Sequence, residues 1–479
     1  MITHAHPDLV NELQQLLGPD RVLSAHSDLV VYECDGFVIE KNSPDVAVLP
    51  NSTDEVAAIV KICNHHDVTF LPRGAGTSLA GGCLPIGGGV MIVLTRMNHI
   101  LEINLRDRYA VVEPGVVNLW LTRALADSGF HYAPDPSSQG ACTIGGNVAT
   151  NSGGPHTLKY GVTTNHVLGV EAVLADGRVI QLGGPVEDSP GLDLVGTVVG
   201  SEGTLAIVTK VWVRITRNPQ GYRTMLAVFD SIEDATNSIS EIIGHGIVPA
   251  ALEMMDQGIV AAIEEAYHFG FPLDAQAVLL IEVDGLEAGL DAARDRIVEL
   301  CNQCGAREVR HAADESERQA LWKCRKKAFG AVGRLSPSYC TQDGVVPRTK
   351  LPHILKRIGD ISEKYDVRIV NVFHAGDGNL HPIVLFDERD SEQVARVLRA
   401  SNEILQECID CGGSVTGEHG IGVEKISFMN KLFTDDDLAT MAHLRDAWNP
   451  SGRLSPGKML PTAGACGMEQ IHPGRKAAL

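Results

Sequence analysis

The sequence predicts an α+β protein built from more than one domain. Residues 44–217 alternate short apolar strands, short helices and glycine-rich turns, whereas the pattern beyond residue 218 is strand, long amphipathic helix, strand, which is typical of an antiparallel sheet covered by helices. A chain of 479 residues is also too long for one domain of usual size. We therefore expect a helical lead-in at 1–42, a first domain at 43–217, a second domain at 218–460 and a tail at 461–479.

Apolar periodicity justifies the individual elements in chain order. Residues 8–17 place leucine and valine at helical spacing, which predicts the helix of the lead-in. In the first domain we expect strands at 47–50, 68–72 and 90–95, and a helix at 53–65 that has an acidic first turn and Ser52 or Thr53 as its N-cap. In the second domain we expect a strand at 224–229, a helix at 232–244 and a buried strand at 277–284.

The composition limits the classes of partner. The chain has 40 basic and 60 acidic residues, a formal net charge of −20, which disfavours direct binding to nucleic acid or to an anionic membrane. No apolar run approaches the roughly 18 residues of a membrane span, and residues 1–8 do not resemble the start of a signal peptide. We therefore expect a cytoplasmic protein that reaches a membrane only through other proteins.

The cysteines predict no disulfide framework. Eleven of them, an odd number, indicate reduced thiols. The pairs Cys301/Cys304 and Cys408/Cys411 have C-x-x-C spacing, but each pair ends a predicted helix and the two pairs lie far apart in the chain. We expect all four to be small core residues, and the chain to carry no iron–sulfur cluster of its own.

Two glycine-rich segments carry histidine beside a carboxylate. The segment from Phe373 to Pro382 contains His374 and His381, and the segment from Gly417 to Gly422 contains Glu418 and His419. Imidazole and carboxylate together suit Zn²⁺, Mn²⁺ or Fe²⁺, and three protein ligands leave coordination positions open for a substrate. The sequence therefore predicts a catalytic divalent-metal site with a spare base. Any one of these histidines taken alone reads as an ordinary core or surface residue.

Three further glycine-rich loops lie in the first domain, at 72–82, 142–154 and 200–209. Their backbone N–H groups and hydroxyls suit a pyrophosphate or a flat ring. The first loop is not the dinucleotide-binding G-x-G-x-x-G pattern, because position 79 is leucine. A single glycine-rich turn is usually only a turn, but three in one domain favour a large, extended nucleotide cofactor.

The segment Gly452–Met459 has the glycine and lysine spacing of an ATP-binding loop. Met459 replaces the hydroxyl residue that binds Mg²⁺ in such loops, and no strand precedes the segment. ATP is therefore not expected, and Lys458 remains a candidate contact to an anion.

Five of these motifs together resemble the FAD-linked oxidases of the vanillyl-alcohol-oxidase or p-cresol-methylhydroxylase type. They are 72–78, 142–154, 200–209, 374–381 and 417–422, and the resemblance covers residues 20–460. It implies an FAD-binding domain of two α/β subdomains at 43–217, a ferredoxin-like antiparallel-sheet cap domain at 218–460 that also carries the substrate and metal residues, and a C-terminal helical segment. It also implies non-covalent FAD, because the histidine that bonds to flavin in some relatives has no counterpart in Gly76-Thr77-Ser78.

The resemblance further implies which residues contact FAD. The first loop and part of the second would line the pyrophosphate, other residues of the second would lie near the isoalloxazine ring, and the third loop would lie toward the adenosine half. In that order the residues are Pro72, Arg73, Gly74, Ala75, Gly76, Thr77, Ser78, Gly145, Gly146 and Asn147, then Cys142, Thr143 and Gly153, then Glu202, Gly203 and Ile207.

By the same resemblance, His374, His381 and Glu418 would bind the divalent metal and His419 would be the catalytic base. A 2-hydroxy acid chelated through its hydroxyl and carboxylate has a lowered hydroxyl pKa. His419 would then take the hydroxyl proton while hydride passes to FAD. Asp377 is either an acceptor that orients a ligating imidazole or a turn former.

The carboxylate of such a substrate needs a cation in so acidic a chain. Arg325 matches the family position that binds it, and arginine suits that bidentate role. Lys326 and Lys327 read as a solvated helix face, and Asn379 is either a polar contact to substrate or a turn residue. Residues 338–347 offer no second cation and Phe329 adds bulk, which favours a small monocarboxylate.

Within the family the motifs look most like those of the FAD-binding subunits of glycolate oxidases, and they are similar to D-lactate and D-2-hydroxyglutarate dehydrogenases. The implied reaction is oxidation of glycolate to glyoxylate, with D-lactate as a second substrate; the alternative is a stand-alone D-lactate or D-2-hydroxyglutarate dehydrogenase. The implied partners are a second FAD-binding-like subunit and an iron–sulfur subunit, which would place the chain in the cytoplasm, peripheral to the inner face of a bacterial inner membrane.

Two interpretations from other classes of protein stay open on the residues alone. A metallohydrolase would use the same His/Glu site to activate water, and a non-catalytic metal-binding or scaffold subunit would use it for stability. Bound flavin distinguishes the redox interpretation from both.

Overall fold

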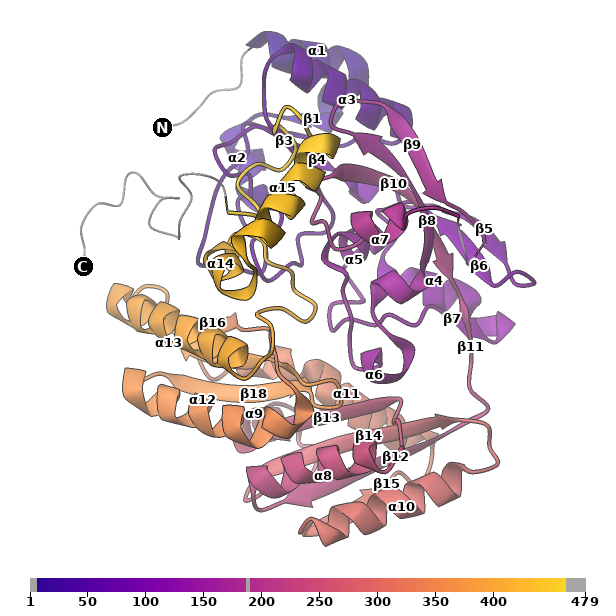
Figure 1. The fold of residues 1–479 in the computed structure, drawn as a ribbon, viewed down its shortest axis with the longest axis vertical. Helices are drawn as coiled ribbons and strands as arrows, with labels where there is room; N and C mark the ends of the chain where they lie inside the picture. Colours follow the sequence, from indigo (N-terminus) through magenta and orange to yellow (C-terminus); the bar gives the residue numbers. More distant parts are fainter. Residues whose placement is uncertain (1–6, 187–189, 462–479) are drawn as a thin grey trace. The chain divides into compact units, whose positions relative to one another are not determined.

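The computed structural model describes residues 7–186 and 190–461 (Figure 1). The chain forms two compact units, which are described separately here. Unit 1 contains the residues up to 152, residues 162–217 and the residues from 418 onward; unit 2 contains residues 153–161 and 218–417. The C-terminal segment of the chain therefore packs with the N-terminal half, and the short segment 153–161 packs with the second half.

The first sheet of unit 1 combines two parallel pairs with an antiparallel edge. Its strand order is β1 (Val22–Leu23), β2 (Val46–Val48), β4 (Val90–Val93) and β3 (Phe70–Arg73), with β2 and β3 both parallel to β4. Helix α3 (Thr53–His65) begins at Ser52, whose side chain accepts a hydrogen bond from the N–H of Glu55. Helix α1 (Pro7–Leu17) contributes its buried leucines to the same core as α3.

The second sheet of unit 1 has five antiparallel strands. Their order is β5 (Ile100–Asn104), β6 (Tyr109–Val112), β10 (Ala206–Arg214), β8 (Val167–Leu174) and β9 (Val179–Gly183). Helices α4 (Asn118–Leu125) and α5 (Ile144–Thr150) share the buried core of this sheet. The N-terminus of α5 carries the second glycine-rich loop.

The C-terminal segment closes unit 1 with α14 (Met429–Leu432) and α15 (Asp435–Trp448). A capping box between Thr434 and Asp437 begins α15. Beyond the helix the chain returns to the first sheet, where the N–H of Ser455 donates to the carbonyl of Phe70 at 2.8 Å.

Unit 2 is built on one large antiparallel sheet. In order its strands are β15 (Glu308–His311), β12 (Gly221–Phe229), β14 (Ala277–Gly285), β13 (Ala251–Asp256), β18 (Arg368–His374), β19 (Asn379–Leu380) and β17 (Gly344–Val345). Strand β20 (Pro382–Phe386) also pairs with β18, and β16 (Ser338–Thr341) pairs with β20. The second domain was predicted to be α+β with an antiparallel sheet, and that fold class is confirmed.

Two groups of helices pack on this sheet (Figure 1). Helices α9 (Gln257–Tyr267) and α11 (Glu315–Val332) share a core with alternate residues of the strands, such as Leu226 and Val228 of β12. The second group contacts the sheet and one another: α8 (Ile232–Gly244), α10 (Leu290–Gln303), α12 (Leu351–Tyr365) and α13 (Ser391–Asp410). Helix α11 also contacts β13 directly, because Arg325 donates to Glu253.

The predicted elements agree closely with the structure. The helices expected at 53–65 and 232–244 have those bounds, and the strand expected at 277–284 is β14. Of the four cysteines in the two C-x-x-C pairs, Cys301 and Cys408 are buried in α10 and α13 as expected, whereas Cys304 and Cys411, at the C-caps of these helices, are only partly buried and are not core residues. Among the helices that the structure describes, none combines the length and the apolar character needed to cross a lipid bilayer.

Candidate active site

The register of two neighbouring strands places a carboxylate against a predicted metal ligand. Glu253 of β13 lies directly opposite His374 of β18. Residues that face each other across an antiparallel pair project to the same side of the sheet. Both oxygens of Glu253 lie within hydrogen-bond distance of His374 Nδ1, at 2.8 and 3.0 Å, and both side chains are buried. A carboxylate at Nδ1 favours the tautomer whose proton is on Nδ1 and whose lone pair, the one a metal would use, is on Nε2.

Arg325 shares the same carboxylate. It lies on α11, is only 1% exposed, and donates from Nε to Glu253 Oε2 at 2.7 Å. Its Nη2 is buried and has no hydrogen-bond partner among the described residues. Burial acts to raise the pKa of Glu253, but its interactions with His374 and Arg325 outweigh burial, so the pKa is lowered.

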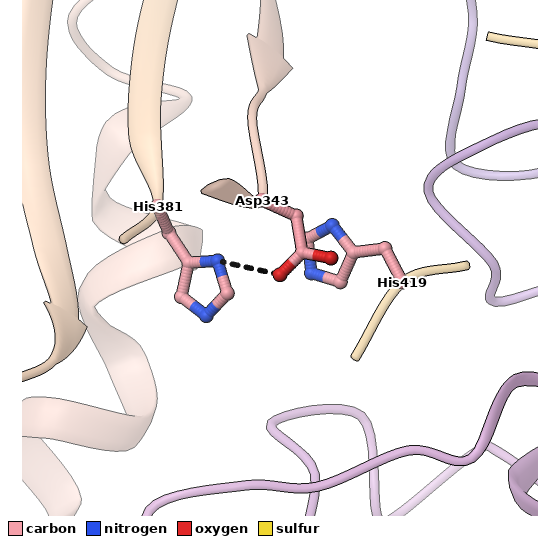
Figure 2. A group of neighbouring side chains, drawn as sticks. All are labelled: Asp343, His381 and His419. Atoms are coloured by element: carbon pink, nitrogen blue, oxygen red, sulfur yellow. Dashed lines mark ion pairs between the residues drawn. The ribbon is translucent and has the colours of Figure 1, made fainter. Parts of the chain in front are cut away.

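His381 lies beside His374 with a carboxylate of its own. The two imidazole rings meet edge to face, with centroids 5.1 Å apart. His381 Nδ1 lies 3.3 Å from the carbonyl of Gln342 and 3.7 Å from Asp343 Oδ1, an ion pair that Figure 2 shows. As for His374, an acceptor at Nδ1 favours the tautomer whose lone pair is on Nε2.

Asp343 also anchors the second histidine-bearing loop. Its Oδ2 accepts hydrogen bonds from Thr416 Oγ1 at 2.7 Å and from the N–H of Gly417 at 2.9 Å. Glu418 and His419 follow Gly417 directly, and consecutive Cα atoms are about 3.8 Å apart, so the chain itself brings them to this anchor. Within unit 2, His374 and His381 belong to one group of side chains that could hold a metal ion.

The chemistry of this donor set fits a divalent transition metal. Two imidazole nitrogens and one carboxylate are the ligands expected for Zn²⁺, Mn²⁺ or Fe²⁺ in an open catalytic site. Each imidazole is backed by a buried acceptor, as metal-binding histidines commonly are. The two histidines that the motif at 374–381 singled out thus lie together in unit 2, in an arrangement that suits the predicted metal.

Asn379 and Asp377 occupy the turn between the two histidines. Asn379 pairs with His374 across β18 and β19, and its Oδ1 is buried without a hydrogen-bond partner in the described part of the chain. A Cβ on Gly417 would lie 2.5 Å from Asn379 Cγ, so only glycine allows the loop to pass this close. Asp377 accepts from the N–H of Asn379 at 3.1 Å, which is the turn-forming role, and Glu253 supplies the carboxylate that orients His374.

The three glycine-rich loops of unit 1 meet one another. A Cβ on Gly74 would lie 2.5 Å from Thr143 Oγ1, which joins the first loop to the second. A Cβ on Gly203 would lie 2.7 Å from Pro72 Cγ, which joins the third loop to the first. Ser78 Oγ is buried and has no hydrogen-bond partner among the described residues. Closely packed backbone with an unused hydroxyl suits a pyrophosphate-containing cofactor.

Several predicted cofactor residues use their side chains within the protein. The guanidinium of Arg73 donates to the carbonyl of Cys34 at 3.0 Å and to Cys83 Sγ at 3.2 Å. The side chain of Asn147 bonds Asn118 and Cys142, and that of Ile207 packs in the core shared with α3. A contact from these residues to a cofactor would therefore come mainly from the backbone.

Lys458 and Glu202 also have internal roles. Lys458 is buried and donates to the carbonyls of Gly82 and Leu84, and burial lowers its pKa to about 8. The sequence had left it as a candidate contact to an anion, but in the structure its ammonium bonds backbone oxygens. The carboxylate of Glu202 accepts from the N–H groups of Ile421 and Gly422, both at 2.7 Å.

Sequence reasoning missed Glu253 and Asp343. A signal existed for Glu253, because a carboxylate inside the apolar run Ala251–Asp256 has to be paired when the strand is buried. Asp343 lies in Gln342-Asp343-Gly344, which reads as an ordinary turn, and no sequence pattern marks it.

Comparison with known proteins gives two family matches. Residues 44–183 match the family described as FAD binding domain, and residues 218–459 match the family described as FAD linked oxidases, C-terminal domain. The glycolate oxidase subunit GlcD of Escherichia coli (strain K12) is 44% identical over 95% of this chain and 91% of that protein. The D-lactate dehydrogenase of Anaerostipes hadrus is 30% identical over 95% of this chain and 97% of that protein.

A solved structure supports the fold. The 4-ethylphenol oxidase from Gulosibacter chungangensis aligns with a TM-score of 0.79 over 94% of this chain and 96% of that chain, at 21% identity. At this identity the likeness concerns the fold alone.

Proposed function

Because the chain belongs to the family of FAD-linked oxidases, we propose that it is an FAD-dependent dehydrogenase that oxidises glycolate to glyoxylate, with D-lactate as a second substrate. The observation that carries this proposal is the buried group in which Glu253 joins His374 to Arg325. It sets a metal-ligand imidazole beside a guanidinium that has a free donor. A 2-hydroxy acid offers matching groups, a chelating hydroxyl and a carboxylate.

FAD supplies the acceptor for the hydride when it is bound. The residues proposed to hold it are those of the three glycine-rich loops, and Ser78 Oγ and the backbone of Gly74 to Ser78 are the donors best suited to the pyrophosphate. We propose that binding is non-covalent, since the first loop carries no histidine.

A divalent metal would act as a Lewis acid that lowers the pKa of the substrate hydroxyl. Its proposed ligands are His374, His381 and Glu418. Support comes from the acceptors that face Nδ1 of the two imidazoles, Glu253 for His374 and Asp343 for His381, because they favour the tautomer with its lone pair on Nε2.

His419 and Arg325 are proposed to act on the substrate directly. Arg325 would bind the carboxylate through its free Nη2, which fixes the orientation of the substrate. His419 would accept the hydroxyl proton as the Cα hydrogen leaves with its electron pair, so that the alcohol carbon is oxidised to a carbonyl. Asn379 Oδ1 is a further candidate contact to the substrate.

The surroundings favour a small substrate. Residues 338–347 contain no lysine or arginine for a second carboxylate. Phe329 lies near His381, with ring centroids 6.5 Å apart. A substrate with a long or doubly charged side chain would meet this ring without a compensating cation, which disfavours D-2-hydroxyglutarate.

We further propose that the chain works as one subunit of a complex. The similar protein from Escherichia coli is named as a subunit. The sequence lacks a ferredoxin-type cysteine run, so an iron–sulfur subunit and a second FAD-binding-like subunit are the proposed route for electrons from reduced flavin toward the inner face of a membrane.

Anaerobic reduction of the bound flavin tests the proposed reaction. Purified protein is expected to show flavin absorbance that bleaches with glycolate, more slowly with D-lactate, and least with L-lactate and D-2-hydroxyglutarate. A colourless protein that rebinds no FAD would leave a metallohydrolase or a scaffold subunit as the better interpretation. Faster bleaching by D-lactate than by glycolate would favour the alternative of a stand-alone D-lactate dehydrogenase, which the relative at 30% identity supports less strongly.

A further inference from the structure

The side chain of Glu253 touches both halves of the proposed site. Its two oxygens lie against His374 Nδ1, and Oε2 also accepts from Arg325 Nε. The side chains of all three are at most 3% exposed, so water does not screen these contacts. We propose that Glu253 is a positioning residue that couples metal binding at His374 to carboxylate binding at Arg325. This inference rests on the proposed function.

The histidine half of the coupling follows from hydrogen-bond chemistry. A carboxylate only accepts, so it holds the His374 tautomer that has its proton on Nδ1 and its lone pair on Nε2. It also makes the imidazole a better electron donor to a metal. Glu253 thereby fixes the orientation of the ring through both of its oxygens.

The arginine half follows from the geometry of the guanidinium. Glu253 occupies Nε, whereas Nη2 has no hydrogen-bond partner among the described residues. An arginine held through Nε keeps its outer edge available for the planar, bidentate recognition of a carboxylate. The carboxylate of Glu253 therefore orients the guanidinium and leaves Nη2 for the substrate.

Coupling arises because one negative charge serves two partners. A metal on His374 Nε2 would make the Nδ1 proton more acidic and draw more of the charge of Glu253 toward the imidazole. The interaction between Glu253 and Arg325 would then weaken, and the guanidinium would attract the substrate carboxylate more strongly. Thermodynamic linkage requires the reverse effect as well, so that a carboxylate bound at Arg325 raises the affinity for the metal.

Glu282 provides a matched control in the same unit. It lies opposite Ala251, two residues from Glu253, so both glutamates project to one face of the sheet. It is equally buried and is bound by Arg318 and Trp322 of α11, the helix that carries Arg325. Thr224, which also donates to Glu282, lies outside the candidate site, as do Arg318 and Trp322. The variants Glu253→Gln and Glu282→Gln therefore impose a similar perturbation at two different places.

The first experiment measures metal affinity without any substrate. Mn²⁺ is titrated into metal-stripped holoenzyme of the wild type and both variants, with flavin content and circular dichroism reporting the fold. Glu253→Gln keeps the volume of the side chain, but its amide N–H₂ would face either His374 Nδ1 or Arg325 Nε, which are both donors. The Mn²⁺ affinity of this variant is therefore expected to fall about 10- to 100-fold. Glu282→Gln is expected to keep the wild-type affinity. Equal affinities for the wild type and Glu253→Gln would overturn the proposal and leave the proposed function intact.

The second experiment tests the coupling itself. Arg325→Met removes one of the two groups that interact with the carboxylate of Glu253. The Mn²⁺ affinity is therefore expected to rise several-fold relative to the wild type. When Glu253→Gln is the background, the same Arg325→Met change is expected to raise the affinity less. If the effects of Arg325→Met and Glu253→Gln on Mn²⁺ affinity are additive, Arg325 acts on the metal independently of Glu253, and the proposed coupling is contradicted.

A non-reacting ligand completes the test. 2-Hydroxyisobutyrate has the hydroxyl and carboxylate of a substrate but no Cα hydrogen, so it binds without reducing flavin. Its affinity for Mn²⁺-saturated enzyme is expected to fall at least fivefold in Glu253→Gln and to stay unchanged in Glu282→Gln. Loss of metal affinity alone would restrict Glu253 to His374 and refute the dual role. A wild type that binds no Mn²⁺ or Zn²⁺ would instead overturn the metal assignment, and the inference with it.

Discussion

The carboxylate of Glu202 accepts a hydrogen bond from the backbone N–H of Gly422 at 2.7 Å, although 220 residues separate them. A second hydrogen bond comes from the N–H of Ile421 at 2.7 Å. Gly420 has φ +87° and a Cβ there would lie 2.8 Å from Glu202 Oε1, so this approach depends on glycine. The third glycine-rich loop thus holds the chain just beyond His419, the proposed base.

Replacing Glu202 by alanine is expected to destabilise unit 1 and to slow the reaction. Two buried N–H groups would lose their acceptor, which costs about 2–4 kcal/mol in free energy of unfolding, and the loop after His419 would lose its anchor. Urea unfolding and kcat for glycolate measure the two effects. Glu171→Ala is the control, since Glu171 is only partly buried and bonds side chains of Thr53 and Lys210. Unchanged kcat in Glu202→Ala would contradict a positioning role.

Glu282 is expected to make unit 2 sensitive to acid. Burial acts to raise its pKa, but hydrogen bonds with His156 and Arg318 outweigh it and lower the pKa to about 2, against an ordinary 4.5. Because the folded-state pKa is depressed, the stabilisation is present above pH 4.5 and is lost as the pH falls toward 2. It amounts to about 3 kcal/mol. Urea unfolding at pH 7, 5 and 3 should show the gap between wild type and Glu282→Gln closing with acid; a constant gap would refute this assignment.

Removal of the proposed metal is expected to abolish substrate oxidation while leaving flavin bound. Without a Lewis acid the substrate hydroxyl keeps its high pKa, so bleaching by glycolate should slow at least 100-fold after chelation. Addition of Mn²⁺ or Zn²⁺ should restore it. His381→Ala should behave like the chelated enzyme, and fast bleaching in both would contradict the metal site.

Arg325→Lys is expected to raise KM for glycolate. Lysine keeps the charge but has neither the planar fork nor an Nε donor for Glu253, which should lower kcat/KM about 10- to 100-fold. The neighbouring variant Lys326→Met removes an exposed cation and should leave KM unchanged. Equal KM values in wild type and Arg325→Lys would show that another group binds the carboxylate.

His419→Gln is expected to lower kcat about 10²- to 10⁴-fold with little change in the affinity for 2-hydroxyisobutyrate. The amide can hydrogen-bond the substrate but cannot accept its proton. Flavin-reduction rates under anaerobic conditions measure the chemical step directly. Retained rates would assign the base to a different group.

Much of the fold was visible in local sequence. The helix Thr53–His65 has an apolar face and the N-cap Ser52, and the strand Ala277–Gly285 is a continuous apolar run. These signals are local, because they depend on side-chain periodicity and on turn residues within a few positions. The glycine-rich loops and the histidine motifs can also be recognised in the sequence, because their residue types suggest ligands without reference to the rest of the chain.

The sequence by itself therefore determined the α+β class, the main elements, and the loops and histidines on which the proposed chemistry depends. Only the tertiary structure decided that Glu253 faces His374 across 121 residues, that Asp343 holds Gly417, and that Glu202 holds Gly422. The physical reason is that strand register and long-range hydrogen bonds are set by the burial of many side chains at once. A single carboxylate in the sequence does not reveal which donor it will meet.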